Sequence, residues 1–250
     1  MIAKLPLTYE NYVFDLYGTL VDIHTDENMP MLWEKLAIFY GFYGAIYEPQ
    51  ELKQKYNELV RNNEGELKLQ IEKTDMKRYS HEASPEIQIE DVFLDLFKYK
   101  NVEADKTLAI HTGQFFRVLS LEYVKTYPGT EKMLESLKEK GKNVYLLSNA
   151  QRIFTLYEMK GIDIFKYFDD ILISSDYKTR KPDIRFFEAL INKHNLDSSK
   201  TLFIGNDSTT DIKGAKAVGF STYYVKSNIS PEADMADDAD YIVKDFDEWN

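Results

Sequence analysis

Short runs of apolar residues, each separated from the next by a helical pattern, constrain the fold of this chain more than any other feature. Continuous apolar runs are typical of parallel strands that are covered on both faces. Strands that alternate with helices build a parallel sheet with right-handed crossovers. We therefore predict an α/β fold with a parallel, Rossmann-like sheet. The expected strands cover residues 12–14, 143–147, 170–173, 201–204, 221–225 and 241–243.

Helical patterns fill the stretches between these runs. One expected helix is capped by Thr130 and ends at Gly141. A second carries the apolar residues of 153–157 and ends at Gly161. A third starts at Pro182, a residue type that suits a first helical turn.

The stretch from about Asp22 to Lys125 differs from the rest of the chain. It has little strand signal and carries four apolar stripes with helical spacing, which normally form the packed faces of helices. The chain returns to the sheet near Tyr127-Pro128-Gly129, a turn signal. We therefore predict an α/β core domain over residues 1–21 and 127–250, with a helical cap domain over residues 22–126 inserted into it.

Composition narrows the range of partners and locations. The net charge of -11 argues against binding to nucleic acid or to an anionic membrane, both of which need a basic surface. It does not exclude a small anionic substrate, because a bound metal ion can reverse the local field. The absence of cysteine excludes thiolate metal sites, and no apolar run is long enough for a membrane span or a signal peptide. We expect a cytoplasmic monomer or homodimer that acts on a small molecule.

Asp15 stands at the end of the first apolar run, just before Gly18. A strand that ends there places the carboxylate at the carboxyl edge of the sheet, where ligands bind in open α/β folds. An aspartate in such a position can act as a nucleophile and form a covalent intermediate. The alternative is an aspartate that only caps a loop or a helix.

Three further polar segments follow expected strands or precede expected helices. They are Ser148-Asn149, Arg180-Lys181-Pro182-Asp183, and the segment from Gly205 to Asp211. Each alone has a simple structural explanation, as a helix cap, a solvated lysine or turn-forming aspartates. Their common position at strand ends and helix starts instead indicates one shared site.

In this order the four segments resemble the four motifs of the haloacid dehalogenase-like hydrolase superfamily. The helical insert after the first motif resembles the cap of that family. The resemblance implies that Asp15 is the nucleophile, that Ser148 and Asn149 contact the phosphoryl group, and that Lys181 balances its charge. We count Gly18 and Thr19 of the first motif among the substrate-binding residues.

The resemblance also implies a Mg²⁺ cofactor. Asp207 and Asp211 resemble the acids that hold the ion, with Asp15 and the backbone carbonyl of Tyr17 as further ligands. The family uses two spacings for the first acid, and Asn206 occupies the alternative position. We favour Asp207 because only it has a carboxylate, and we keep Asn206 as an amide ligand.

Tyr17 departs from the phosphatase pattern, in which this position holds a second catalytic aspartate. A tyrosine with an ordinary pKa of ~10 is a poor general base at neutral pH. The Asp-x-Tyr-Gly-Thr form resembles the 2-haloacid dehalogenase branch, where halide leaves without a proton. That branch works without Mg²⁺, lacks the acidic pair and uses an arginine early in the cap, whereas this chain has no arginine between Thr19 and Val60.

The sequence thus leaves three functions open. The first is Mg²⁺-dependent, phosphatase-type hydrolysis of a small phosphorylated metabolite through an aspartyl-phosphate on Asp15, with Tyr17, Ser148 and Lys181 as the other catalytic residues. The second is metal-independent hydrolysis of a carbon–halogen bond. The third is a protein that binds a phosphoryl ligand with weak turnover. We favour the first because the five residues Asp15, Ser148, Lys181, Asp207 and Asp211 occur together.

Overall fold

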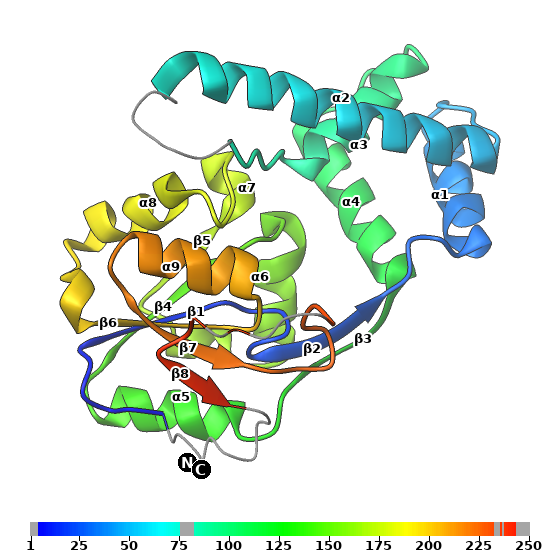
Figure 1. Cartoon of the computed structure of the whole chain (residues 1–250). Coiled ribbons are helices and arrows are strands. Elements are labelled where there is room, and N and C mark those ends of the chain that lie inside the picture. The colour runs from blue at the N-terminus through cyan, green and yellow to red at the C-terminus, as the bar shows by residue number, and fades with distance from the viewer. Residues whose placement is uncertain (1–4, 76–82, 233–235, 237, 244–250) are drawn as a thin grey trace.

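A six-stranded sheet in the order β5-β4-β1-β6-β7-β8 lies in the lower part of the molecule in Figure 1, with helices α1 to α4 above it. All neighbouring strands are parallel, which confirms the predicted α/β class. The computed structural model describes residues 5–75, 83–232, 236 and 238–243, so the extreme ends of the predicted core domain and residues 76–82 of the predicted cap domain lie outside the described residues. The strands are β1 (Asn11–Phe14), β4 (Asn143–Ser148), β5 (Asp170–Ile173), β6 (Thr201–Gly205), β7 (Ser221–Val225) and β8 (Tyr241–Val243).

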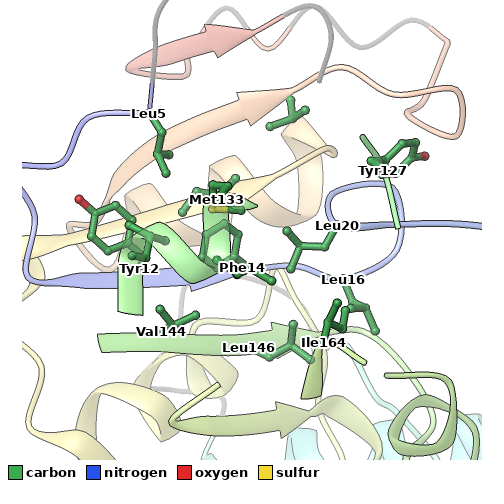
Figure 2. Packing of buried hydrophobic residues seen from close by; sticks show 14 of the residues in the cluster. Leu5, Tyr12, Phe14, Leu16, Leu20, Tyr127, Met133, Val144, Leu146 and Ile164 are labelled. Carbon is green, nitrogen blue, oxygen red and sulfur yellow. The ribbon is translucent and has the colours of Figure 1, made fainter. Parts of the chain in front are cut away.

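The sheet is covered on both faces, as its uninterrupted apolar strands predict. Alternate residues of β1 enter different clusters, because side chains along a strand point to opposite faces. Tyr12 and Phe14 pack in one cluster with Met133 of helix α5, Thr130–Glu139 (Figure 2). Val13 packs in the other cluster with Phe187 of helix α8, Ile184–His194. Because the strands are parallel and held in place by packing on both faces, their carboxyl ends lie along one edge of the sheet.

The core helices agree with the expected pattern except at their ends. Thr130 is the first residue of its helix rather than the cap, because Gly129 with a φ of 79° precedes the helix. The third helix begins at Ile184, and the Asp183 side chain caps it by accepting from the backbone N–H of Arg185, so the expected start at Pro182 was wrong. The helices are α5 (Thr130–Glu139), α6 (Arg152–Gly161), α7 (Ser174–Tyr177), α8 (Ile184–His194) and α9 (Lys213–Ala217).

The insert contains four helices in the part of the chain that the structure describes (Figure 1). Their apolar faces form one cluster, which also takes in Ile153 of α6. Tyr40 and Tyr47 lie inside this cluster and donate to the backbone carbonyls of Phe93 and Leu96. The helices are α1 (Pro30–Phe42), α2 (Pro49–Asp75), α3 (Ile89–Tyr99) and α4 (Lys106–Ser120).

Two short strands connect the insert to the core, which the sequence did not indicate. β2 (Val21–Thr25) and β3 (Leu121–Thr126) pair as an antiparallel ribbon. Most residues of β3 are exposed or half-buried, so this strand lacks the apolar run that identified the others. β2 crosses the predicted start of the cap domain at residue 22, and β3 ends at its predicted end at residue 126; both boundaries remain a prediction.

A third connection lies between α2 and α3. The backbone N–H of Arg180 donates to the Ser84 carbonyl at 2.9 Å, and the N–H of Ile89 donates to the Gln151 side chain at 3.0 Å. The segment around Ser84 therefore lies against the loop that carries Lys181. None of the helices in the described ranges is both long and apolar enough to cross a bilayer.

Candidate active site

Asp15 is the first residue after β1, at the centre of the carboxyl edge of the sheet. Its backbone N–H donates to the carbonyl of Ile204 on the neighbouring β6 at 2.9 Å, which continues the sheet pairing by one residue. The side chain is almost completely buried. The strand therefore delivers the carboxylate to the predicted position.

Two other predicted residues contact the Asp15 carboxylate directly. The hydroxyl of Ser148, the last residue of β4, donates to Asp15 Oδ1 at 3.0 Å. The Lys181 ammonium donates to the same oxygen at 2.7 Å. Lys181 is itself buried, with 2% of its surface exposed. The structure thus brings together residues that are far apart in the sequence.

Asp211 completes this cluster from the turn after β6. Its Oδ2 atom accepts from the backbone N–H groups of Asn206 at 3.1 Å and Asp207 at 3.2 Å. Its Oδ1 atom lies 2.7 Å from Lys181 Nζ in a buried ion pair. A side chain on Gly205 would place its Cβ 2.4 Å from Asp211 Oδ2, so this close approach of the carboxylate requires glycine.

Burial and charge shift the pKa values of the paired groups. Burial raises the pKa of Asp211 to about 7, with the Lys181 ammonium opposing this rise and the Asp15 carboxylate adding to it. Burial alone would lower the pKa of Lys181, but the Asp15 and Asp211 carboxylates raise it. The ammonium therefore stays charged at neutral pH, and one positive charge faces two carboxyl groups.

Asn206 and Asp207, the two candidates for the first metal ligand of this segment, have different surroundings. Asp207 Oδ1 accepts from the backbone N–H groups of Thr209 at 2.7 Å and Thr210 at 3.0 Å. It therefore caps the π-helical turn over residues 208–212. The Asn206 side chain instead is buried and accepts from the Thr19 hydroxyl at 3.2 Å.

Gly18 and Thr19 have structural contacts with the same asparagine. A Cβ on Gly18 would lie 2.2 Å from Asn206 Nδ2, and the φ of Gly18 is +84°, so only glycine suits this position. Asn149, which we expected at the substrate, is paired with the backbone of Lys181. Its Nδ2 donates to the Lys181 carbonyl at 3.0 Å, and its Oδ1 accepts from the Lys181 N–H at 2.8 Å. Asn149 therefore holds the lysine loop in place.

The Tyr17 hydroxyl takes part in a separate polar network. It donates to Glu158 Oε2 and lies 3.2 Å from the Thr155 hydroxyl, both on α6. Burial and then the Glu158 carboxylate raise the pKa of Tyr17 far above its ordinary value. Tyr17 is therefore unsuited to the role of a general base. Arg117 of α4 donates to both oxygens of the Glu158 carboxylate.

Sequence reasoning missed Glu158 and Arg117. Arg117 lies within an apolar helical stripe and Glu158 follows Tyr157 on another helix. The sequence contains no signal that pairs them, because their meeting depends on how α4 packs on α6.

The carboxylates of Asp15 and Asp211 both contact the Lys181 ammonium. Within the described ranges, no group of three or more His, Asp or Glu side chains is arranged to hold a metal ion. The donors are nevertheless oxygens, and two carboxyl groups share one ammonium. Asp211 Oδ1, which pairs with the Lys181 ammonium at 2.7 Å, is a further donor atom. This donor set fits a hard divalent cation, with the amide oxygen of Asn206 as a neutral ligand.

The residues of this cluster lie within a match to the model of a known family. The model of the haloacid dehalogenase-like hydrolases matches residues 9–219. A solved dehalogenase with an intermediate complex has a TM-score of 0.56 at 19% identity over 98% of this chain and 96% of its own, which shows the shared fold.

Curated relatives include both phosphatases and dehalogenases. The pyrimidine 5′-nucleotidase of Streptococcus pneumoniae is 26% identical over 86% of this chain and 83% of its own. The (S)-2-haloacid dehalogenase 4A of Burkholderia cepacia is 22% identical over 88% and 84%. The glyceraldehyde 3-phosphate phosphatase of Methanothermobacter thermautotrophicus is 27% identical over 50% of this chain, and the match spans only 56% of that relative. The family match, the fold and the cluster around Asp15 agree, and the chain belongs to the haloacid dehalogenase-like hydrolases.

Proposed function

We propose that the protein hydrolyses a small phosphorylated metabolite through an aspartyl-phosphate on Asp15. One observation carries this proposal: the Asp15 carboxylate lies at the carboxyl edge of the sheet with the Ser148 hydroxyl at 3.0 Å and the Lys181 ammonium at 2.7 Å. The similarity to phosphatases supports a phosphorylated substrate.

Each residue of the cluster has a part in this reaction. A carboxylate oxygen of Asp15 attacks phosphorus and forms an O–P bond, while the bond from phosphorus to the leaving oxygen breaks. Lys181 balances the negative charge that gathers between the nucleophile and the phosphoryl group. Ser148 donates to a phosphoryl oxygen. Water then attacks the acyl-phosphate, which regenerates Asp15 and releases inorganic phosphate.

Mg²⁺ is the proposed cofactor. Asp15, Asp211, the backbone carbonyl of Tyr17 and the amide oxygen of Asn206 would hold it, and Asp207 is the weaker candidate because its side chain caps a turn. The ion would polarise the phosphoryl group and reduce the repulsion between two anions.

The position of Tyr17 limits the substrates. Because its hydroxyl is bound to Glu158, no acid from this position protonates the leaving group. The loss of general acid catalysis costs about 10²–10⁴-fold for poor leaving groups. We therefore propose a preference for acyl and aryl phosphates over alkyl phosphates.

Tyr17 also favours a second candidate, the hydrolysis of a 2-haloacid without metal. Halide leaves without a proton, so the missing acid costs nothing in that reaction. The Lys181 ammonium would then be the only cation beside Asp15 within the described residues. A phosphoryl-binding protein with weak turnover is the remaining alternative.

A substrate panel separates these functions. Purified protein is assayed with acetyl phosphate, p-nitrophenyl phosphate and 2-chloropropionate, each with Mg²⁺ and with EDTA. We expect release of phosphate that needs Mg²⁺ and is absent in Asp15→Asn. Chloride release in EDTA would instead establish the dehalogenase, and binding of Mg²⁺ without any turnover would establish the binding protein.

A further inference from the structure

A buried ion pair connects the insert to the core next to the nucleophile loop. Arg117 Nε donates to Glu158 Oε1 at 2.6 Å and Nη2 donates to Oε2 at 3.3 Å, so the guanidinium binds both carboxylate oxygens. Arg117 belongs to α4 of the insert, and Glu158 belongs to α6 of the core. Their side chains are only 17% and 8% exposed. Such fork-shaped pairs fix orientation as well as charge.

The same carboxylate accepts a hydrogen bond from the Tyr17 hydroxyl. Tyr17 lies between Asp15 and β2, the strand that leads into the insert. Arg117 lies close to the end of α4, just before β3 leads back to the core. Glu158 thus touches the nucleophile loop and the end of the last cap helix at once. A rotation of α4 about the connecting ribbon has to break this contact or move Tyr17.

We propose that Arg117 and Glu158 are positioning residues, which set the orientation of the insert relative to the core and hold Tyr17 away from the reacting atoms. Neither is a catalytic residue, since both act through Tyr17 and α4. A buried ion pair is weak evidence for stability, because desolvation offsets much of its attraction. Its geometric selectivity is the better explanation for its place at this junction.

A first experiment measures the orientation of the insert without any enzymatic reaction. The chain has no cysteine, so spin labels can be placed at two introduced cysteines. Ile38→Cys on α1 and Glu135→Cys on α5 are exposed sites on the insert and the core. We expect one narrow distance distribution in this background, and a broader or shifted one after Arg117→Ala or Glu158→Gln. An unchanged distribution in both variants would overturn the proposal.

A matched control removes an ion pair on the same helix that does not reach the insert. Arg152 of α6 pairs with Asp176 of α7, and both belong to the core. Arg152→Ala should leave the distance distribution unchanged. If Arg117→Ala does not fold, Arg117→Lys keeps the charge but loses the fork, and the exchange variant Arg117→Glu with Glu158→Arg should restore the narrow distribution.

A second experiment rests on the proposed function. Acetyl phosphate is too small to need much contact with the insert. The larger p-nitrophenyl phosphate needs the insert in its correct orientation. Misplacement of about 1 Å can cost about 10²-fold in rate. We expect Glu158→Gln to lower kcat/KM for p-nitrophenyl phosphate by about this factor and for acetyl phosphate much less. Equal losses for both substrates would indicate a purely structural pair, and the label distances remain informative even if wild type hydrolyses neither.

Discussion

The Lys181 ammonium lies 2.7 Å from Asp15 Oδ1 and holds the Asp15 carboxylate in an ion pair that is nearly inaccessible to water. The same nitrogen lies 2.7 Å from Asp211 Oδ1. One lysine therefore holds two carboxylates that belong to different strand ends. Without it, two like charges would face each other in a region of low dielectric, where their repulsion is strong.

Replacement of this lysine should destabilise the fold. We expect Lys181→Met to lower the free energy of unfolding at pH 8 by about 3–5 kcal/mol, because it leaves buried charges without their partner. Urea denaturation followed by circular dichroism measures the difference. Lys138→Met is the matched control, because Lys138 forms a partly exposed pair with Asp169 and such pairs contribute about 0–1 kcal/mol. Equal losses in the two variants would contradict the arrangement.

The raised pKa of Asp211 makes stability depend on pH. Burial raises its pKa from 3.8 in the unfolded chain to about 7 in the fold. The folded state then holds a proton that the unfolded state has lost, so this contribution is complete below pH 3.8 and disappears as the pH rises through 7. We expect the free energy of unfolding of wild type, measured in EDTA, to decrease as the pH is raised from 3.8 to 7. The decrease should exceed that of Asp211→Asn by up to about 1.4 kcal/mol per pH unit. If the free energies of unfolding of wild type and Asp211→Asn changed with pH in parallel, the raised pKa of Asp211 would be contradicted.

The sequence predicted which segments meet, because strand ends are marked by residue type. Apolar runs stop at Asp15, after Leu147 and at Gly205, and strands buried on both faces must end at one edge. Side-chain direction within a turn was not predictable in the same way. Asn206 and Asp207 are neighbours, and the choice of Asp207 as metal ligand, which rests on its carboxylate, stays a prediction; the structure adds that Asp207 Oδ1 accepts from backbone N–H groups of the turn.

Contacts between segments that are far apart in the sequence could not be predicted, for a different reason. Tyr17 and Glu158 are 141 residues apart, and each has an ordinary surface-helix or loop context. Their hydrogen bond depends on the packing of α6 against the nucleophile loop, which no local pattern records. The ordinary pKa of a tyrosine therefore raised doubt about a general-base role for Tyr17, but the sequence did not predict its contact with Glu158.

The two neighbouring residues of the fourth motif should respond differently to substitution. Asn206→Asp adds a carboxylate against Gly18 and Thr19, in the loop that follows Asp15, while keeping an acceptor for the Thr19 hydroxyl. We expect lower stability in EDTA from charge repulsion and at least about tenfold tighter Mg²⁺ binding, since ligand charge sets affinity. Melting temperatures with and without Mg²⁺ measure both effects. A melting temperature that does not respond to Mg²⁺ in this variant would exclude Asn206 as a ligand position.

Asp207 provides the comparison. Asp207→Ala should cost about 0.5–2 kcal/mol through the lost cap, and Asp207→Asn almost nothing, because asparagine caps equally well. Neither change should alter Mg²⁺ affinity by much if the carboxylate serves the turn. A large loss of Mg²⁺ binding in Asp207→Asn would instead restore the residue as a metal ligand.

Tyr17→Asp should extend the range of substrates. The shorter side chain cannot reach Glu158 as the tyrosine does, and it places a carboxyl group two residues after the nucleophile. A carboxyl group there can protonate a poor leaving group and then activate water, which is worth up to about 10²–10⁴-fold. We expect kcat/KM for an alkyl phosphate such as glycerol phosphate to rise relative to that for acetyl phosphate.

Tyr17→Asn is the control for Tyr17→Asp. Asparagine has about the same size as aspartate and also removes the hydrogen bond to Glu158, but it supplies no proton. Steady-state kinetics of the two variants on both substrates separate acid–base chemistry from a general loosening of the loop. A rise in alkyl phosphate hydrolysis in Tyr17→Asp alone would show that position 17 faces the leaving group once the bond to Glu158 is removed. Equal behaviour of the two variants would mean that the backbone directs this side chain toward α6 whatever residue stands there, and the preference for good leaving groups would then need another cause.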